Sequence, residues 1–202
     1  MSSGRHEHAI APPELPRREP YRTWPGALAV LAVILVYLGI VIVIDDHTPT
    51  DLEPVAAGKP LAVGAVLTVV PEDGYALDVS DSSPDPDKPS TQLVGPTGNF
   101  LISVNSWNGT LAQLVEREKD EFTAYADARP LGDDATFTAP GLSGTSFSLL
   151  LDNGKQARAW ISVDETAKRS IVISAASPSE VFRQALPHAQ AMVDSVRVEA
   201  QR

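Results

Sequence analysis

Hydrophobic and polar residues alternate over much of the chain from about residue 66 onward, a pattern that predicts β-strands. The first strands are expected near 66–70, 75–80, 91–94 and 99–106. A weaker signal predicts a strand near 135–139. Three further strands are expected over 145–151, 156–163 and 169–175. Asp152-Asn153-Gly154-Lys155 contains the Asn-Gly pair of a two-residue hairpin turn. Short strands with such close connections predict a largely antiparallel sheet.

Two amphipathic helices are expected to interrupt these strands. Thr110 begins a capping-box pattern, Thr-Leu-Ala-Gln, and apolar residues at helical spacing follow it, which predicts a helix over 111–126. The second helix is expected to begin at Ser177-Pro178-Ser179-Glu180, with Ser177 as the cap and Glu180 closing a capping box. Pro187 should kink this helix near its middle. Residues 195–198 then resemble a short closing strand.

The alternation suggests that the sheet has one apolar face and one mixed face. The residues assigned to the apolar face are Phe100, Ile102, Val104, Phe147, Leu149, Leu151, Ile161, Val163, Ile171 and Ile173. Those assigned to the mixed face are Ser103, Asn105, Trp107, Ser146, Ser148, Arg158, Trp160, Ser162 and Ser174. Elements in this order predict an α+β fold.

Trp107, Arg158 and Trp160 are the candidate partner-binding residues. All three fall on the mixed face, and tryptophan and arginine are frequent at the centres of recognition surfaces. For Trp107 this holds only if its strand runs unbroken from Asn99. The alternative is that a helix covers the mixed face and that both tryptophans belong to the core.

Residues 27–44 form the most apolar segment of the chain. These 18 residues carry no charge, and as a helix they would span about 27 Å, close to the ~30 Å of a bilayer's hydrocarbon core. A buried core helix would show a polar stripe, and a signal peptide would be followed by a small-residue cleavage site. Neither feature is present, so we expect an uncleaved, single-pass transmembrane helix of the signal-anchor type, with the lipid bilayer as its partner.

Positive residues near this segment predict its orientation. Arg17, Arg18 and Arg22 precede it, whereas Lys59 stands alone on the other side among acidic residues. Because positive flanks stay in the cytoplasm, we expect the N-terminus inside and the C-terminal part outside the cell membrane. The expected organisation is a disordered cytoplasmic tail (1–26), a transmembrane helix (27–44), a linker (45–65) and an extracytoplasmic α+β domain (66–199).

Composition narrows the range of functions. The 202 residues include 16 basic and 26 acidic ones, a net charge of −10, and no cysteine. An acidic chain argues against nucleic acid as the main partner. The absence of cysteine excludes a disulfide scaffold, a thiol nucleophile and cysteine-ligated metals.

Searches for catalytic or metal-binding patterns point away from an enzyme. Gly141-Leu142-Ser143-Gly144 fails the spacing of a hydrolase G-x-S-x-G motif. His188 alone among the four histidines falls in the expected domain. Asp81, Asp85 and Asp87 lack the glycine and glutamate of a calcium-binding loop. We therefore expect no catalytic residue, no cofactor and no metal.

The order of the elements resembles the PsbP-like domains. A turn-rich first half, a helix after Trp107, a three-stranded meander and a C-terminal helix ending in Ala-Met-Val-Asp-Ser-Val-Arg-Val carry this resemblance over roughly residues 66–199. It implies an α/β/α sandwich of the kind found in exported actinobacterial proteins, often lipoproteins, that act as non-enzymatic binding or assembly modules. This chain departs from them because it lacks a lipobox cysteine and carries an apolar helix instead.

The leading interpretation is a non-catalytic binding or assembly module, anchored in the membrane and facing a protein partner outside it. One alternative is a hydrolase or transferase of the cell envelope with an unrecognised site. Another is an accessory subunit that joins a membrane complex through its transmembrane helix.

Overall fold

The computed structural model describes residues 51–199, which belong to a folded unit spanning Thr50–Arg202. The expected tail (1–26) and transmembrane segment (27–44) lie outside the described residues. None of the helices within 51–199 has the length and apolar character needed to cross a bilayer.

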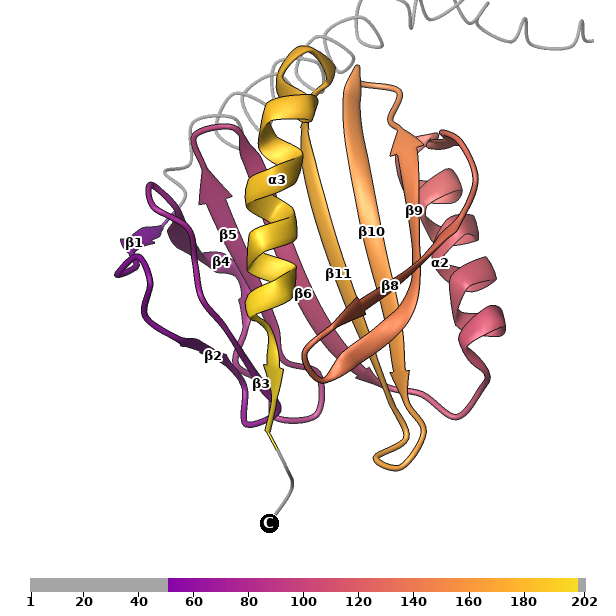
Figure 1. The fold of residues 1–202 in the computed structure, drawn as a ribbon, viewed down its shortest axis with the longest axis horizontal. Coiled ribbons are helices and arrows are strands. Elements are labelled where there is room, and N and C mark those ends of the chain that lie inside the picture. Colours follow the sequence, from indigo (N-terminus) through magenta and orange to yellow (C-terminus); the bar gives the residue numbers. More distant parts are fainter. Residues whose placement is uncertain (1–50, 200–202) are drawn as a thin grey trace, which may run out of the picture. The chain divides into compact units, whose positions relative to one another are not determined.

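The described chain forms two antiparallel sheets and two helices (Figure 1). The elements are β1 (Leu52–Pro54), β2 (Leu61–Val63), β3 (Leu67–Val69), β4 (Ala76–Ser83), β5 (Ser90–Gly95), β6 (Gly98–Ser106), α2 (Leu111–Ala126), β7 (Arg129–Pro130), β8 (Ala135–Ala139), β9 (Leu142–Leu150), β10 (Lys155–Asp164), β11 (Arg169–Pro178), α3 (Ser179–Ser195) and β12 (Arg197–Val198). This confirms the predicted α+β class with a largely antiparallel sheet.

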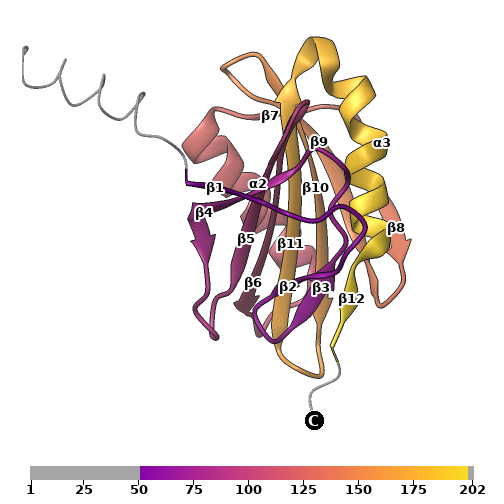
Figure 2. The ribbon, with the colours of Figure 1, turned by 90° about the vertical axis from the view of Figure 1, so that its left-hand side faces the viewer.

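The large sheet has nine strands in the order β1-β4-β5-β6-β11-β10-β9-β7, and β8 also pairs with β9. The small sheet has the order β12-β3-β2. The helices α2 and α3 lie on opposite faces of the large sheet, and the small sheet lies on the α3 side (Figure 2). These layers are those of an α/β/α sandwich.

The register of the strands divides the apolar residues between the two faces. Residues directly opposite each other in an antiparallel pair share a face. Phe100, Ile102 and Ile173 pack toward α3 and the small sheet, whereas Phe147 and Ile161 pack toward α2. The prediction of one apolar and one mixed face is therefore wrong: each strand alternates as expected, but the large sheet has an apolar core on both sides.

The folded domain begins earlier than the expected boundary at residue 66. β1 pairs with β4 through Leu52 and Asp78, and β2 pairs with β3 through Leu61 and Val69. Both strands fall in the stretch 45–65 that was expected to be a linker. Each has only three residues, too few to show a period of alternation.

The start of α2 follows the prediction, and the start of α3 does not. The Thr110 hydroxyl accepts from the Gln113 amide, and the Gln113 side chain accepts from the Thr110 amide, which completes the capping box. In α3 the N-cap is Pro178, without a side-chain hydrogen bond. Ser177 instead belongs to β11, where it lies opposite Gln156. The ladder of β10 and β11 thus continues past the expected helix start.

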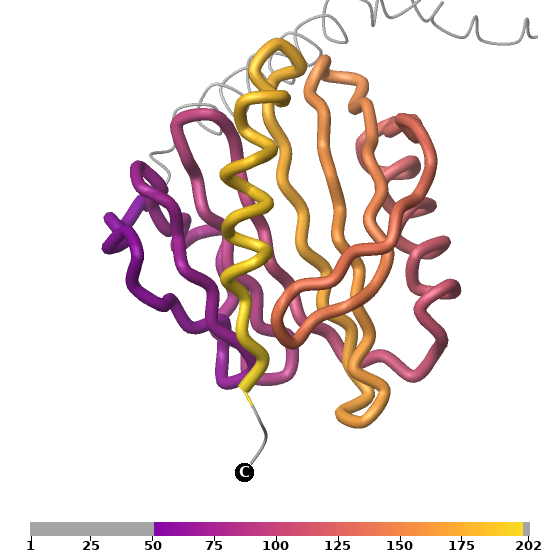
Figure 3. Tube along the Cα trace, in the orientation of Figure 1, coloured from indigo at the N-terminus to yellow at the C-terminus, as the bar shows by residue number. Residues whose placement is uncertain are grey.

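The predicted hairpin between β9 and β10 is present, but the two-residue turn is not: the loop covers residues 152–154, and Asn153 has no positive φ. The Leu151 amide donates to the Lys155 carbonyl, and Gly154 has a positive φ of 76°. The amide and hydroxyl of Ser179 both donate to the Gly154 carbonyl, the hydroxyl at 2.7 Å. The hairpin therefore holds the first residue of α3 in place, and the tube trace in Figure 3 shows the two turning close together above the sheet.

Candidate binding surface

A partly exposed surface lies on the α3 side of the large sheet, over the ends of strands that no helix covers. Figure 1 shows α3 in front of β6 and β11, with the upper ends of β9 and β10 free of any helix on that side. We call this surface the open face. It consists of Arg129, Leu131, Ser148, Leu150, Gln156 and Arg158.

The register places the members of the open face beside one another. Leu150 lies opposite both Arg129 and Gln156, so these three form one row. Ser148 lies opposite Arg158 in the next row. The Ser148 carbonyl accepts a hydrogen bond from the Leu131 amide at 2.8 Å. All of these strand residues share a face with Ala175 and Ser177 of β11, which lie beneath α3.

Arg158 is positioned on the open face by two contacts. Its Nη2 donates to the Ser146 hydroxyl at 2.9 Å, and its guanidinium carbon lies 5.7 Å from the centre of the Trp160 ring. Its Nε is covered and has no hydrogen-bond partner. Within residues 51–199, no carboxylate oxygen lies within 4.0 Å of the Arg158 guanidinium. The prediction that Arg158 is available to a partner therefore remains a proposal that the geometry permits.

Two exposed leucines add apolar area to the open face. Leu131 is 44% exposed and Leu150 is 39% exposed. Large apolar side chains at such exposure mark an interaction surface when they lie together and are rimmed by polar groups. Here they lie beside two arginines, a residue type that is enriched among the energetically dominant contacts of interfaces.

Trp160 does not belong to this surface. It is 0% exposed and lies in the core cluster that includes Ile173, Met192 and Leu142. The expectation that Trp160 binds a partner is therefore wrong, and the alternative holds, because α3 and β8 cover this part of the mixed face. Its Nε1 is buried without a hydrogen-bond partner in the described structure.

Trp107 lies on the other side of the large sheet. β6 ends at Ser106, and the indole packs with the residues beneath α2, where the Arg117 guanidinium lies 4.6 Å from the ring centre. The Trp107 Nε1 donates to the Thr110 carbonyl at 3.3 Å, so the ring braces the first turn of α2. Trp107 and Arg158 are therefore on opposite faces, and the three candidate residues form no common patch.

A groove of about 370 Å³ lies between the small sheet and the β4–β5 hairpin. Its apolar part comes from Leu61, Leu77 and Val79, and the rest comes mainly from serine and threonine hydroxyls and backbone. Its volume falls in the range of small-molecule sites. It contains no charged side chain, so it offers a ligand shape and hydroxyl groups but no ionic anchor.

A buried carboxylate lies on β4 between two residues that line this groove, Leu77 and Val79. Asp78 is 2% exposed and accepts from the Ser80 amide and hydroxyl, the Asp81 amide and the Gln92 side chain. The register of β4 against β5 shifts between Asp78 and Ser83, which is a β-bulge. Burial raises the pKa of Asp78, but hydrogen bonds from Ser80, Asp81 and Gln92 outweigh it and hold the pKa below the ordinary value of 3.8.

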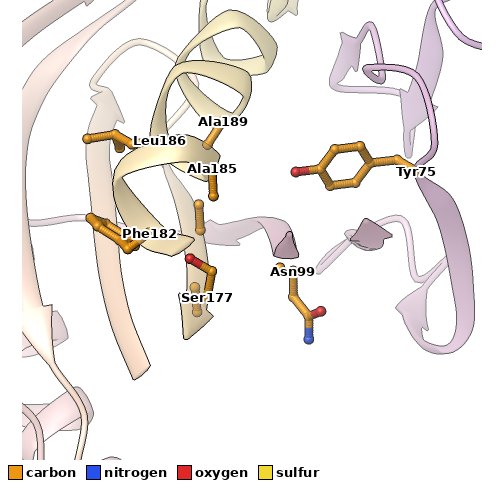
Figure 4. Close-up of a pocket in the computed structure, with 10 residues that line it drawn as sticks. Tyr75, Asn99, Ser177, Phe182, Ala185, Leu186 and Ala189 are labelled. Atoms are coloured by element: carbon orange, nitrogen blue, oxygen red, sulfur yellow. The ribbon is translucent and has the colours of Figure 1, made fainter. Parts of the chain in front are cut away.

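A small cavity lies beneath the start of α3 (Figure 4). The Tyr75 side chain points toward α3 from across the cavity, and the Ser177 hydroxyl is buried beside it without a partner. Burial raises the pKa of the Tyr75 phenol. The cavity measures about 10 Å³, roughly the space of a single water molecule. It is a packing feature and not a ligand pocket.

The residues weighed as metal ligands do not come together. The Asp81 carboxylate accepts from Gln92 Nε2 at 2.9 Å, and the Asp85 carboxylate accepts from the Asp87 amide at 2.9 Å. Within residues 51–199, no three His, Asp or Glu side chains are grouped as a metal site would require. His188 Nδ1 lies 3.3 Å from Glu72 Oε2 on the surface. His6 and His8 lie outside the described residues.

The sequence pattern placed Arg158 and Ser148 on one face, but it did not identify Arg129, Leu131 or Leu150 as members of the surface. Arg129 and Leu131 belong to β7 and the residue after it, and a two-residue strand leaves no alternation to recognise. Leu150 was assigned to a strand but to no surface. Only the pairing of β7 with β9 places Arg129 and Leu131 beside Arg158.

No protein-family model matches the chain, and no curated protein matches it. Solved structures with a similar arrangement include a protein from Bacteroides thetaiotaomicron (13% identity, TM-score 0.42, 72% of this chain and 50% of that one). They also include cyanobacterial PsbP (CyanoP) from Synechocystis (10% identity, TM-score 0.42, 72% of this chain and 98% of that one). A third is the Ran-binding protein Mog1p from Saccharomyces cerevisiae (11% identity, TM-score 0.47, 69% of this chain and 94% of that one).

A PsbP structure is thus among the similar ones. The chain spans about half the length of the Bacteroides protein. At these identities and TM-scores the likeness concerns the arrangement of strands and helices, and no activity or partner is transferred from it.

Proposed function

We propose that this protein is a non-catalytic binding or assembly module that receives a protein partner on the open face. The observation that carries the proposal is the combination of two arginines and two exposed leucines on one uncovered end of the sheet. Arginine with exposed apolar side chains is a composition typical of interaction surfaces. The sheet beneath is packed on both faces, so the surface is presented on a rigid support.

We further propose that the domain is held outside the cell membrane by residues 27–44. The support for this is the uncharged apolar run of 18 residues, long enough to cross a bilayer, and the basic residues before it. In this arrangement the N-terminal tail is cytoplasmic and the open face is available to partners in the membrane or the envelope. An accessory subunit of a membrane complex would use the same face together with the apolar segment.

A topology reporter tests this placement. A reporter that is active only in the cytoplasm, fused after Arg202, is expected to stay silent, and one that is active only outside the cytoplasm should give a signal. The positive flank at Arg17, Arg18 and Arg22 is the physical reason. In the matched control, serine replaces these three arginines and three arginines are introduced after Asp46 instead. This variant should weaken or reverse the difference between the two reporter signals. A cytoplasmic signal from the unchanged chain would contradict the proposed orientation.

A further inference from the structure

We infer that the occupant of the open face is an acidic peptide segment of a partner protein, with apolar side chains next to its carboxylates. The inference rests on the proposed function and names the chemistry of the partner. It follows from the charge of the open face, from the way this chain pairs its other arginines, and from the positions of the two leucines.

The open face carries two arginines on a domain that is acidic as a whole. Residues 51–199 contain 11 basic and 21 acidic residues, a net charge of −10. The open face contains Arg129 and Arg158. Asp127 and Asp152 lie at its border, where they line a hollow together with Arg129 and Leu150. In the structure that covers 51–199, neither guanidinium has a carboxylate oxygen within 4.0 Å. Guanidiniums that have no ion pair within the domain favour a partner that brings carboxylates.

Of the four other arginines in residues 51–199, two receive carboxylates and two, Arg183 and Arg197, do not. Arg117 meets Glu118 and Glu121 on α2, and Arg169 meets Asp164 across the β10–β11 turn. Arg158 is also partly buried, but it is bonded only to the neutral Ser146 hydroxyl. A guanidinium held in place without a counter-charge is already oriented for a carboxylate that arrives from the solvent side.

The leucines require apolar groups in the same segment. Leu150 lies opposite Arg129 in the register, and Leu131 bonds through its amide to the strand position opposite Arg158. Leu150 therefore lies beside Arg129, and Ser148 separates Leu131 from Arg158. A segment that places carboxylates over Arg129 and Arg158 would cover Leu131 and Leu150 with its neighbouring side chains, and these are favourable only if they are apolar.

An anionic lipid surface is the competing occupant. It would also supply negative groups and apolar area. The domain as a whole has a charge of −10, so approach to an anionic bilayer is opposed by the rest of its surface. A short peptide segment contacts only the open face and avoids this repulsion.

Binding of designed peptides to the full chain, kept in an uncharged detergent, tests the inference. The probe is a fluorescent 12-residue peptide containing glutamate, leucine and serine. One control has lysine in place of glutamate, and another has serine in place of leucine. We expect the first peptide to bind about tenfold more tightly than either control, because each control removes one of the two complementary features.

Variants of the chain locate the binding. R129Q with R158Q is expected to weaken binding of the acidic peptide about tenfold, and R129Q alone, at an exposed position, should weaken it in the same direction without disturbing the core. K88Q with K168Q removes the same two charges from exposed positions elsewhere and should leave binding unchanged. Far-UV circular dichroism verifies that each variant is folded.

Several results would overturn the inference. They are equal binding of the acidic and basic peptides, equal losses in the two double variants, or binding of phosphatidylglycerol vesicles that depends on Arg129 and Arg158 while the acidic peptide does not bind. The proposed function is tested separately by cross-linking from Leu131. Cross-linking that succeeds while the peptides fail to discriminate would refute the acidic partner and leave the binding module intact.

Discussion

Replacing Trp160 with alanine is expected to lower the free energy of unfolding by about 3–5 kcal/mol, the range for truncating a large buried aromatic side chain. The indole is 0% exposed and lies between the sheet, α3 and the β8 strand. Its removal leaves a cavity that these elements fill only in part. Urea unfolding of a fragment that starts at Asp51, and so retains β1, measures the loss.

Trp107→Ala is the matched control for this prediction. The Trp107 ring is partly exposed and contacts Arg117, so its loss should cost clearly less than that of Trp160. A loss below about 1 kcal/mol for Trp160→Ala would mean that the ring is not part of a packed core. Equal losses for the two variants would contradict the assignment of Trp107 to a half-exposed site.

Asp78→Asn is expected to lower the free energy of unfolding at neutral pH by about 1.5–3 kcal/mol, the range for hydrogen bonds to a charged group. The carboxylate accepts from Ser80, Asp81 and Gln92 at the bulge of β4, and an amide cannot accept on both of its terminal atoms. The loss should be accompanied by loosening of the groove that the bulge borders.

The pH dependence of stability should change in the same variant. The pKa of Asp78 is lower in the folded protein than its ordinary value of 3.8. Its stabilising contribution is therefore complete above the unfolded pKa and is lost as the pH falls through the folded pKa. Urea unfolding from about pH 6 to about pH 2 should show a shallower acid-side loss for Asp78→Asn than for the parent. Asp81→Asn, at an exposed carboxylate beside the bulge, is the control, because it leaves the hydrogen bonds to the Asp78 carboxylate in place. Identical profiles for the parent and Asp78→Asn would show that this carboxylate is not stabilised by its hydrogen bonds.

Local patterns of the sequence were enough to find most of the elements. The helix from Leu111 to Ala126, the Asn-Gly hairpin and the strands from Gly98 onward depend on contacts between near neighbours in the chain. Each of these has enough residues to show a period or a recognisable turn.

The faces of the sheet could not be predicted in the same way. Alternation shows that Phe147 and Ser146 point to opposite faces, but not which of these faces Ile173 shares. That depends on the pairing of β10 with β11, which places Trp160 opposite Ile173. The burial of Trp160 and the separation of Trp107 from Arg158 both follow from this register.

The predicted start of α3 was too early because strand pairing overrides the capping preference of Ser177. Ser177 has the sequence of a helix cap, yet it extends the ladder of β11 opposite Gln156. Once paired, its side chain turns beneath the helix, and the helix begins at Ser179. The strand pairing joins residues that are distant in the sequence, so the local pattern around Ser177 does not predict it. The short strands β1, β2 and β7 were not predicted, because three or fewer residues show no period of alternation.

The central claim, that the open face receives a protein partner, is tested most directly by site-specific photo-cross-linking in living cells. A photoreactive amino acid replaces Leu131 in the full chain, and in a control it replaces Val79, a similarly exposed residue of β4, which pairs with the opposite edge strand β1. The account predicts a discrete cross-linked product from position 131 that is absent from position 79. No product from position 131, or the same product from both positions, would contradict it.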